Sequence, residues 1–281
     1  MKPPDPGIHY NIPEAEYRAW PCVNISSLIE LLPPDGTPAD YLYALDNPYQ
    51  SPAMALGTAT HVAVLQPDLF KATYVCGPDC RRGTKQWDAA EAEAGSNGSR
   101  LVKPDEYNQA VAMGGAVRGH AGSAEYLMRG AAEVSFVWKD SITGLLCKGR
   151  IDWVAGFVLV DLKTTMDLSW RFLERRIAEH HYAARAAFYL DGLQSVTGDE
   201  YGPFVHIWVR NKNAPLVRCT YLRKRDIKLG RFQYQSCLAV LAECKRTKQW
   251  PGYGDDVRPI GVPAWAIPEG YDLITGGMTN D

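Results

Sequence analysis

Long apolar runs are missing from this sequence: none approaches the ~18–20 residues needed to span a bilayer. The first residues, MKPPDPGIHY, also lack the basic-then-apolar pattern of a secretory signal. We find neither internal repeats nor low-complexity segments. These absences argue against a membrane or secreted protein and lead us to expect a cytoplasmic one.

Closely spaced cysteines are scarce as well. Of seven cysteines only Cys76 and Cys80 are near each other, and no second close pair completes a zinc or iron–sulfur ligand set. Scattered cysteines in a reducing compartment are typical free thiols. The sequence therefore does not indicate a structural metal cluster.

A basic excess is absent too, because 30 Lys and Arg stand against 32 Asp and Glu, giving a formal net charge of −2. This balance leaves a nucleic-acid partner open, since a few local cations can meet the phosphates. A chain of 281 residues with 46% hydrophobic residues can bury one substantial core.

Hydrophobic patterning divides the chain into helical and strand-forming stretches. Helical spacing is found at 55–65, 107–127, 170–193 and 228–248, and strand-like stretches at 133–138, 145–154, 157–163, 204–211 and 216–222. This order predicts an α/β fold with a central mixed sheet flanked by helices. We expect one domain over 1–281, with an N-terminal helical and loop segment (1–55), a core (56–248) and a Pro/Gly-rich C-terminal wrap (249–281).

The strongest chemical signal is GRIDWVAGFVLVDLKTT, residues 149–165. Asp152 ends one predicted strand, and Asp161 and Lys163 lie on the next, with Ala155-Gly156 as the expected turn. A hairpin loop of two or four residues then places Asp152 opposite Leu159. Because residues two apart share a face, all three charged side chains converge on one side. An odd-length loop without a bulge sends them to opposite faces.

Converging carboxylates repel each other unless a cation lies between them or one takes up a proton. Asp152, Asp161 and the carbonyl oxygen of Leu162 are ligands of the kind that magnesium prefers. Lys163 beside them can orient an attacking water and offset charge on phosphorus. These groups suit phosphodiester hydrolysis. The alternative is that they are exposed strand charges, but Asp161 follows the apolar run FVLV, where an unpaired charge is costly.

The motif GRIDW…VDLKTT resembles the core of the RecE-type exonucleases, which include exonuclease VIII and belong with lambda exonuclease and the RecB nuclease domain to the PD-(D/E)xK superfamily. Further segments are similar to that family in the same order: YNIPEAEY with NISSL, MALGTATHVAVLQPDLF, RRGTKQW, AAFYLDGL and LAECKRTKQWPGYG. Several separate segments in order are more specific than any single motif.

The resemblance implies a restriction-endonuclease-like core and digestion of linear double-stranded DNA from an end, 5′ to 3′, leaving 3′ single-stranded tails for annealing-type recombination. It implies one or two magnesium ions, with manganese able to substitute. It also implies a ring-shaped homo-oligomer (trimer or tetramer), a single-strand annealing protein as partner, and a phage or prophage gene expressed in a bacterial host cell.

Residue by residue, the resemblance implies a metal role for His61 and Glu133 beside Asp152, Asp161 and the Leu162 carbonyl, with Lys163 catalytic. A packed core histidine is the alternative for His61, and a solvated strand-end acid the alternative for Glu133.

The family helix carries Gln-x-x-x-Tyr, where this chain has Arg185 and Tyr189, four residues apart and so on one helix face. We expect Tyr189 to keep a catalytic and DNA-binding role. Arg185 replaces an amide and could bind phosphate, compete with the metal, or be a surface residue. Arg81 and Arg82 are further candidates for contacts to the DNA backbone, although most charge runs are simply solvated.

Two other functions stay open at this point. The first is a catalytically weak or inactive DNA-end-binding protein that keeps the nuclease fold, with Arg185 as the mark of lost catalysis. The second is an endonuclease, or an iron–sulfur nuclease, although four clustered cysteines for the latter are not evident.

Overall fold

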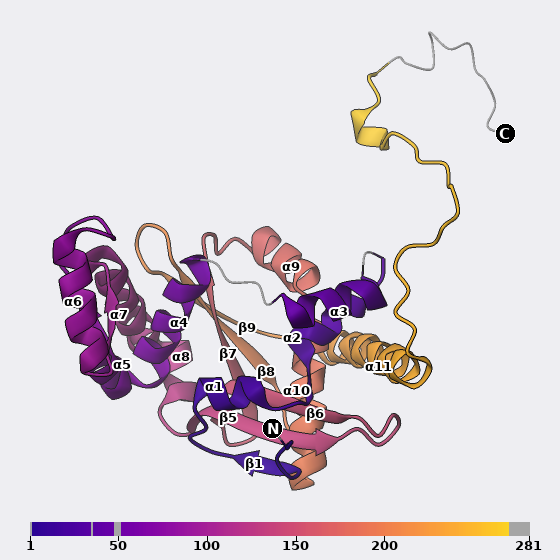
Figure 1. The fold of residues 1–281 in the computed structure, drawn as a ribbon, viewed down its shortest axis with the longest axis horizontal. Coiled ribbons are helices and arrows are strands. Elements are labelled where there is room, and N and C mark those ends of the chain that lie inside the picture. The colour runs from indigo at the N-terminus through magenta and orange to yellow at the C-terminus, as the bar shows by residue number, and fades with distance from the viewer. Residues whose placement is uncertain (1, 35, 48–51, 270–281) are drawn as a thin grey trace.

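A curved mixed β-sheet forms the centre of the molecule in the computed structural model, which describes residues 2–34, 36–47 and 52–269 (Figure 1). The strand order is β1-β5-β6-β7-β8-β9, and β2 pairs with β6. The strands are β1 (Gly7–His9), β2 (Val23–Asn24), β5 (Ala131–Lys139), β6 (Leu146–Ala155), β7 (Val158–Thr165), β8 (Phe204–Arg210) and β9 (Val217–Tyr221).

The pairing within this sheet is of both kinds. β7 and β8 are parallel, as are β2 and β6, whereas the other neighbouring strands are antiparallel. The predicted α/β class with a central mixed sheet is therefore confirmed. A parallel β7–β8 pair requires a long crossover, which α9 and α10 supply. A second sheet pairs β3 (Tyr74–Cys76) with β4 (Arg100–Val102).

Helices cover both faces of the main sheet. The helices of the described residues are α1 (Glu14–Ala19), α2 (Ile25–Leu28), η1 (Ile29–Leu31), α3 (Pro38–Asp46), α4 (Pro52–Leu65), α5 (Pro67–Thr73), α6 (Lys85–Ser96), α7 (Pro104–Gly119), α8 (Ala121–Leu127), α9 (Trp170–Glu179), α10 (Tyr182–Thr197), α11 (Lys224–Thr247) and η2 (Ala264–Ala266). Among the residues that are described, no helix has both the length and the apolar character needed to cross a bilayer.

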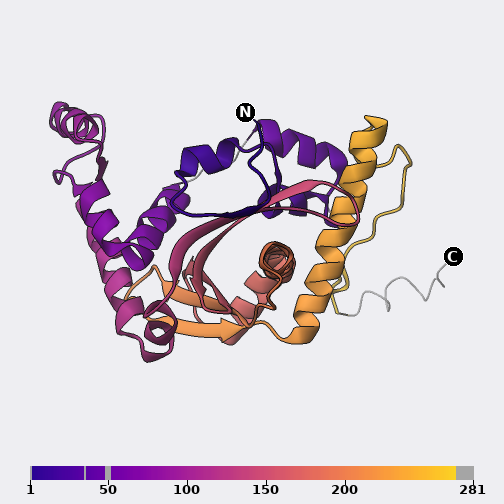
Figure 2. The same cartoon turned by 90° about the horizontal axis from the view of Figure 1, so that it is seen from below.

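The largest core lies between the sheet, α10, α11 and the N-terminal helices. Figure 2 shows α10 end-on inside the curve of the sheet, with α11 beside it. Phe136, Ile151 and Phe188 are fully buried there, together with Leu28 of α2. A second core on the opposite face joins β7 and β8 to α4 and α7. The site-bearing strands are thus held from both sides.

Two predicted helices are each divided into two. The stretch 107–127 is interrupted at His120, between α7 and α8, and the stretch 170–193 is interrupted between α9 and α10. His181 has a φ of 51°, in the left-handed region, which ends regular helical geometry. Helical spacing in the sequence does not reveal such breaks, because both pieces keep an apolar face.

The β6–β7 turn differs from the one expected. It consists of Gly156-Phe157 rather than Ala155-Gly156, so that Leu159 faces Val154 instead of Asp152. Gly156 has a φ of 60° at the first turn position, a conformation that strains alanine but not glycine. The observed pairing of β6 with β7 is shifted by two positions from the expected pairing. An even shift leaves every side chain on the expected face of the sheet, and extending the pairing by one residue beyond Trp153–Val160 places Asp152 opposite Asp161.

The C-terminal segment begins with contacts to the body. Trp250 stacks on Tyr41 with ring centroids 6.0 Å apart, and the Ala39 N–H donates to the Pro251 carbonyl at 3.2 Å. Farther along, Val257 and Trp265 are exposed, and the chain extends away from the body (Figure 1). The wrap expected over 249–281 stays a prediction, because 270–281 lie outside the described residues.

The contact between α10 and α11 depends on Gly230. A Cβ added at this position would overlap the backbone carbonyl of Ala183. We predict that Gly230→Ala lowers the free energy of unfolding by about 1–3 kcal/mol, as overpacked cores do. Gly115 of α7 is the matched control, because its added Cβ meets nothing within 4 Å. Gly115→Ala should be neutral or stabilising by about 0.5–1 kcal/mol. Equal denaturation midpoints for the two variants would contradict this packing.

Candidate metal centre and active site

The candidate site lies at a fork where β6 and β7 separate. The last paired residues of the two strands are Trp153 and Val160. Beyond them the Leu162 N–H donates to Oδ2 of Asp152 at 2.7 Å instead of to a backbone carbonyl of β6. β7 continues to pair with β8 as far as Thr165. Two acids, Asp152 and Asp161, therefore stand at the opening.

Glu133 reaches the same fork from β5 through an unusual backbone. The neighbouring pairs Ala132–Trp153 and Val134–Ile151 keep the β5–β6 register, but Glu133 between them has a φ of 52°. A left-handed conformation costs a non-glycine residue about 1 kcal/mol. Such strain persists where surrounding structure fixes it and is concentrated at functional sites.

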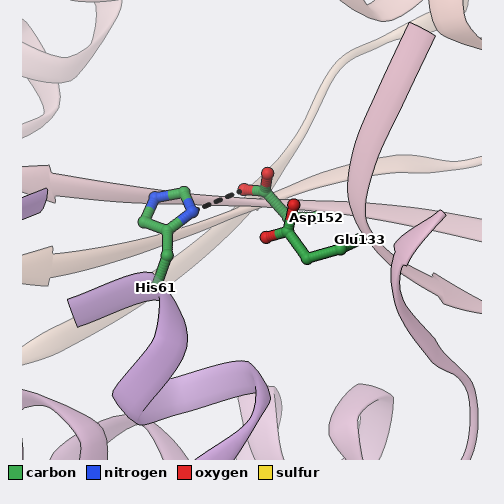
Figure 3. Close-up of side chains that lie close together, drawn as sticks. All are labelled: His61, Glu133 and Asp152. Carbon is green, nitrogen blue, oxygen red and sulfur yellow. Dashed lines mark ion pairs between the residues drawn. The ribbon is translucent and has the colours of Figure 1, made fainter. Parts of the chain in front are cut away.

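His61 enters the fork from α4. Its Nδ1 lies 3.5 Å from Oδ2 of Asp152, and one ligand atom each from His61, Glu133 and Asp152 fall within 4.8 Å of one another. Figure 3 shows the imidazole turned toward the Asp152 carboxylate, with the Glu133 carboxylate beside it. The structure thus brings together three of the residues that the sequence had proposed as metal ligands.

Asp161 and Lys163 form an ion pair on β7. Lys163 Nζ lies 2.7 Å from both carboxylate oxygens and directs its hydrogen bond to Oδ1. The ammonium also lies over the ring of Tyr182, 5.4 Å from its centroid. Asp161 is therefore held by the lysine, and its carboxylate lies outside the group formed by His61, Glu133 and Asp152.

Burial and crowding raise the pKa values of Glu133 and Asp152. Burial, and then the negative charge of Asp152, raise the pKa of Glu133 to about 8. Burial also raises the pKa of Asp152, against the opposing effect of His61. Two neighbouring carboxyls with raised pKa values need either protons or a cation.

In the Asp161–Lys163 ion pair, both pKa values shift in the direction that favours the charged forms. Burial by itself would raise the pKa of Asp161, but Lys163 and His206 outweigh it and the pKa is lowered. Burial likewise disfavours the ammonium of Lys163, yet Asp161 and Asp152 hold its pKa above the ordinary value. Lys163 is therefore a cation at neutral pH and cannot act as a base in this state.

His206 is a residue that the sequence did not reveal. It pairs with Asp161 across the parallel β7–β8 ladder, and its Nε2 lies 4.0 Å from Oδ2 of that acid. The side chain is 1% exposed among aromatic rings, and burial lowers its pKa to about 4. A neutral imidazole behind Asp161 can help to orient the carboxylate. No local motif signals a partner that pairs across a crossover connection.

Tyr189 lies on the same side of the sheet as these groups. Its half-buried ring stacks near Phe204, and burial raises its pKa to about 12, so that the phenol keeps its proton. Arg185 contacts another part of the chain. Its Nη1 donates to Oγ of Ser26 at 2.9 Å and its Nε to the carbonyl of His180 at 3.1 Å. The guanidinium thereby ties the N-terminal segment to α10.

The remaining predicted site residues are Arg81, Arg82 and Leu162. Nη2 of Arg82 donates to both carboxylate oxygens of Glu106, and the guanidinium lies over Trp87; Arg82 belongs to the loop before α6. Arg81, beside it, is exposed. This loop is not joined to the fork by any contact seen among the described residues. Leu162 buries its side chain in the core and contributes only its backbone to the fork.

The residues present fit a divalent cation. Asp161 Oδ2 is buried, lies 2.7 Å from Lys163 Nζ and accepts no other hydrogen bond within the described structure. Carboxylate oxygens with one imidazole nitrogen are donors that suit magnesium or manganese. His61, Glu133, Asp152 and Asp161 are the side chains that could hold such an ion.

A family model described as "PDDEXK-like domain of unknown function" matches residues 27–259. The chain belongs to this family. The match places this PDDEXK-like domain in the PD-(D/E)xK nuclease superfamily, as its motif had suggested, without singling out the RecE type.

Comparison with solved structures agrees on the fold. A protein from Eubacterium rectale that is provisionally described as an exonuclease superposes with a TM-score of 0.60 at 16% sequence identity. The superposition covers 95% of this chain and 100% of the other. No curated protein matches the sequence.

Divalent cations should stabilise the PDDEXK-like domain through Asp152. At a hundredfold excess over Kd, binding to the folded state adds about 2.7 kcal/mol, which corresponds to a rise in Tm of roughly 5–10 °C. We predict this rise with Mg²⁺ or Mn²⁺ for the wild type and its loss in Asp152→Asn, measured by thermal unfolding.

The metal-free Asp152→Asn variant should melt close to the metal-free wild type, because asparagine can still accept from Leu162 N–H. Asp88→Asn, an exposed acid on α6, is the control and should respond to the cation as the wild type does. An undiminished rise in Tm for Asp152→Asn would show that the cation binds elsewhere.

Proposed function

We propose that this protein is a metal-dependent exodeoxyribonuclease acting on linear double-stranded DNA. The observation that supports this most is the fork itself, where two acids on separating strands, a third acid on a strained backbone and a half-buried lysine converge. Phosphodiester hydrolysis needs positive charge beside the scissile phosphate and a positioned water, and these groups can provide both.

The cation would be held by His61, Glu133, Asp152 and Asp161, with the Leu162 carbonyl as a further candidate ligand. When bound, a divalent cation polarises phosphate oxygens and lowers the pKa of a coordinated water. Magnesium is the ion we propose, with manganese as an effective substitute because one ligand is an imidazole. One or two ions are compatible with this number of ligands.

Lys163 supplies a fixed positive charge. Its ammonium is held by Asp161 and the Tyr182 ring, so that little reorganisation is needed when a phosphate arrives. It can donate to a non-bridging phosphate oxygen or orient the attacking water. The phenol of Tyr189, which keeps its proton, can donate a hydrogen bond to the same substrate.

The finer features of the proposal rest on the resemblance to RecE-type exonucleases. They are attack from a DNA end in the 5′ to 3′ direction, 3′ single-stranded products, a ring-shaped homo-oligomer of three or four chains, a single-strand annealing protein as partner, and DNA-backbone contacts by Arg81, Arg82 and Arg185. We also propose a cytoplasmic location in a bacterial host.

The alternative is a catalytically inactive DNA-end-binding protein. It is suggested by Arg185, which stands where the RecE-type family has glutamine. Its guanidinium is occupied by Ser26 and His180, and no described contact joins it to Asp161 or Lys163. The acids and the lysine therefore keep an arrangement suited to catalysis. We accordingly favour the active enzyme.

Neutralising the Asp161–Lys163 pair should abolish hydrolysis without unfolding the protein. Removing one member of a buried pair is destabilising by about 3–5 kcal/mol, so the informative variant is the double substitution Asp161→Asn with Lys163→Gln. We predict a loss of at least about a hundredfold in the rate of nucleotide release, as for loss of a positioned charge, with Tm near that of the wild type.

The assay uses linear duplex labelled at either the 5′ or the 3′ end, with Mg²⁺ or with chelator, and covalently closed circular DNA as control. An exonuclease releases nucleotides from the linear substrate only, whereas cleavage of the circle indicates an endonuclease. Hydrolysis by the double variant at the wild-type rate would remove the assignment of these residues.

Arg185→Gln, which restores the amide usual in the RecE-type family, tests the alternative. We predict a rate of DNA hydrolysis within about threefold of the wild type, together with a loss of about 1 kcal/mol in stability from the missing hydrogen bonds. Lys228→Gln, an exposed substitution on α11, is the control for stability. A rise of tenfold or more in the rate would mean that Arg185 suppresses catalysis.

A further inference from the structure

Lys163 belongs to a row of side chains that crosses three strands. It pairs with Trp208 of β8, which pairs with Arg218 of β9. Paired residues on adjacent strands point to the same face, and strands lie about 4.8 Å apart, so the Cα of Arg218 is about 10 Å from that of Lys163. Arg218 therefore lies on the same face of the sheet as Lys163, with Trp208 between them.

Trp170 covers the end of this row. It is the first residue of α9 and is 60% exposed, and the guanidinium carbon of Arg218 lies 4.2 Å from its ring centroid. Leu173, one turn later, is buried with Tyr182 and Trp208, which fixes α9 on the sheet. The indole is thus anchored through its helix while a large part of its surface is open to solvent.

The surroundings of Trp170 carry positive charge and exposed apolar surface. Arg171 of α9 is exposed, whereas Arg175 is also exposed but pairs with Glu179 at 2.6 Å, and Met166 in the loop between β7 and α9 is 64% exposed. Nη1 of Arg218 is buried and has no hydrogen-bond partner among the described residues. An exposed aromatic ring beside a guanidinium is complementary to a nucleotide, which offers a flat base and acceptor oxygens.

We propose that Trp170 and Arg218 form a stacking platform for an unpaired nucleotide of the DNA substrate, next to Lys163. The proposal rests on the proposed nuclease function and adds the substrate feature that the site recognises. A base inside a duplex has both faces covered by its neighbours, so the occupant is a nucleotide at a frayed end or in a single-stranded tail. Stacking tolerates every base, which suits an enzyme without sequence preference.

The test measures binding of the full-length protein to two fluorescein-labelled DNAs in chelator, by anisotropy. One is a hairpin duplex with a single-stranded tail, and the other is the same hairpin with a blunt end. Stacking contributes on the order of a tenfold or greater change in affinity per base. We predict that Trp170→Ala weakens binding of the tailed hairpin about tenfold and of the blunt hairpin less than twofold.

Trp170→Phe, which keeps an aromatic face, should recover most of the affinity. Phe232→Ala is the matched control, because Phe232 is an aromatic residue of similar exposure (70%) on α11. This control should bind both DNAs like the wild type. The Tm of Trp170→Ala should also equal that of the wild type, since the buried anchor Leu173 is unchanged.

Salt dependence separates the two members of the platform. Loss of one phosphate contact reduces the slope of log affinity against log salt by about 0.7 for single strands. Arg218→Gln should show this reduction, whereas Trp170→Ala should keep the wild-type slope, because stacking releases no counterions.

Three outcomes would overturn the platform: Trp170→Ala binding within twofold of the wild type, equal losses for Phe232→Ala, or equal losses on blunt and tailed hairpins. Failure of the nuclease function is seen separately, in the wild type. A wild type that binds the tailed hairpin through Trp170 but does not cut DNA with Mg²⁺ or Mn²⁺ overturns the function and keeps the platform. A wild type that cuts DNA normally while Trp170→Ala binds unchanged overturns the platform alone.

Discussion

The separation of β6 from β7 is the constraint on which the site depends. Where the backbone ladder stops, the Asp152 carboxylate accepts the Leu162 N–H that a neighbouring strand would otherwise bind. A buried N–H must find an acceptor, and here the acceptor is an acid of the site. The hydrogen bond therefore satisfies the opened backbone and fixes the carboxylate at the same time.

The electrostatics of the fork follow from this placement. Asp152 and Glu133 are crowded together with raised pKa values, whereas Asp161 is charged and paired with Lys163. A divalent cation would relieve the repulsion on one side of the fork. The crowding of these two acids therefore lowers the stability of the fold, and binding of a cation can restore it.

The sequence predicted five strands of the main sheet, β5 to β9, because apolar runs such as FVLV are long and strongly patterned, but it missed the short β1 and β2 in the segment expected to be helix and loop. It also predicted the shared side of Asp152 and Asp161, since the turn moved the register by an even number of positions. What it missed depends on distant pairing or on backbone geometry. His206 reaches Asp161 only through the crossover of α9 and α10, and the left-handed Glu133 is not signalled by its residue type.

Locating a bound ion tests the central claim most directly. Anomalous diffraction from crystals of the full chain grown with Mn²⁺ would place the metal without reference to activity. The account predicts a peak in the fork within about 2.0–2.4 Å of carboxylate oxygens from Asp152 and at least one other acid of the site. A fully occupied manganese site elsewhere, with the fork empty, would contradict it.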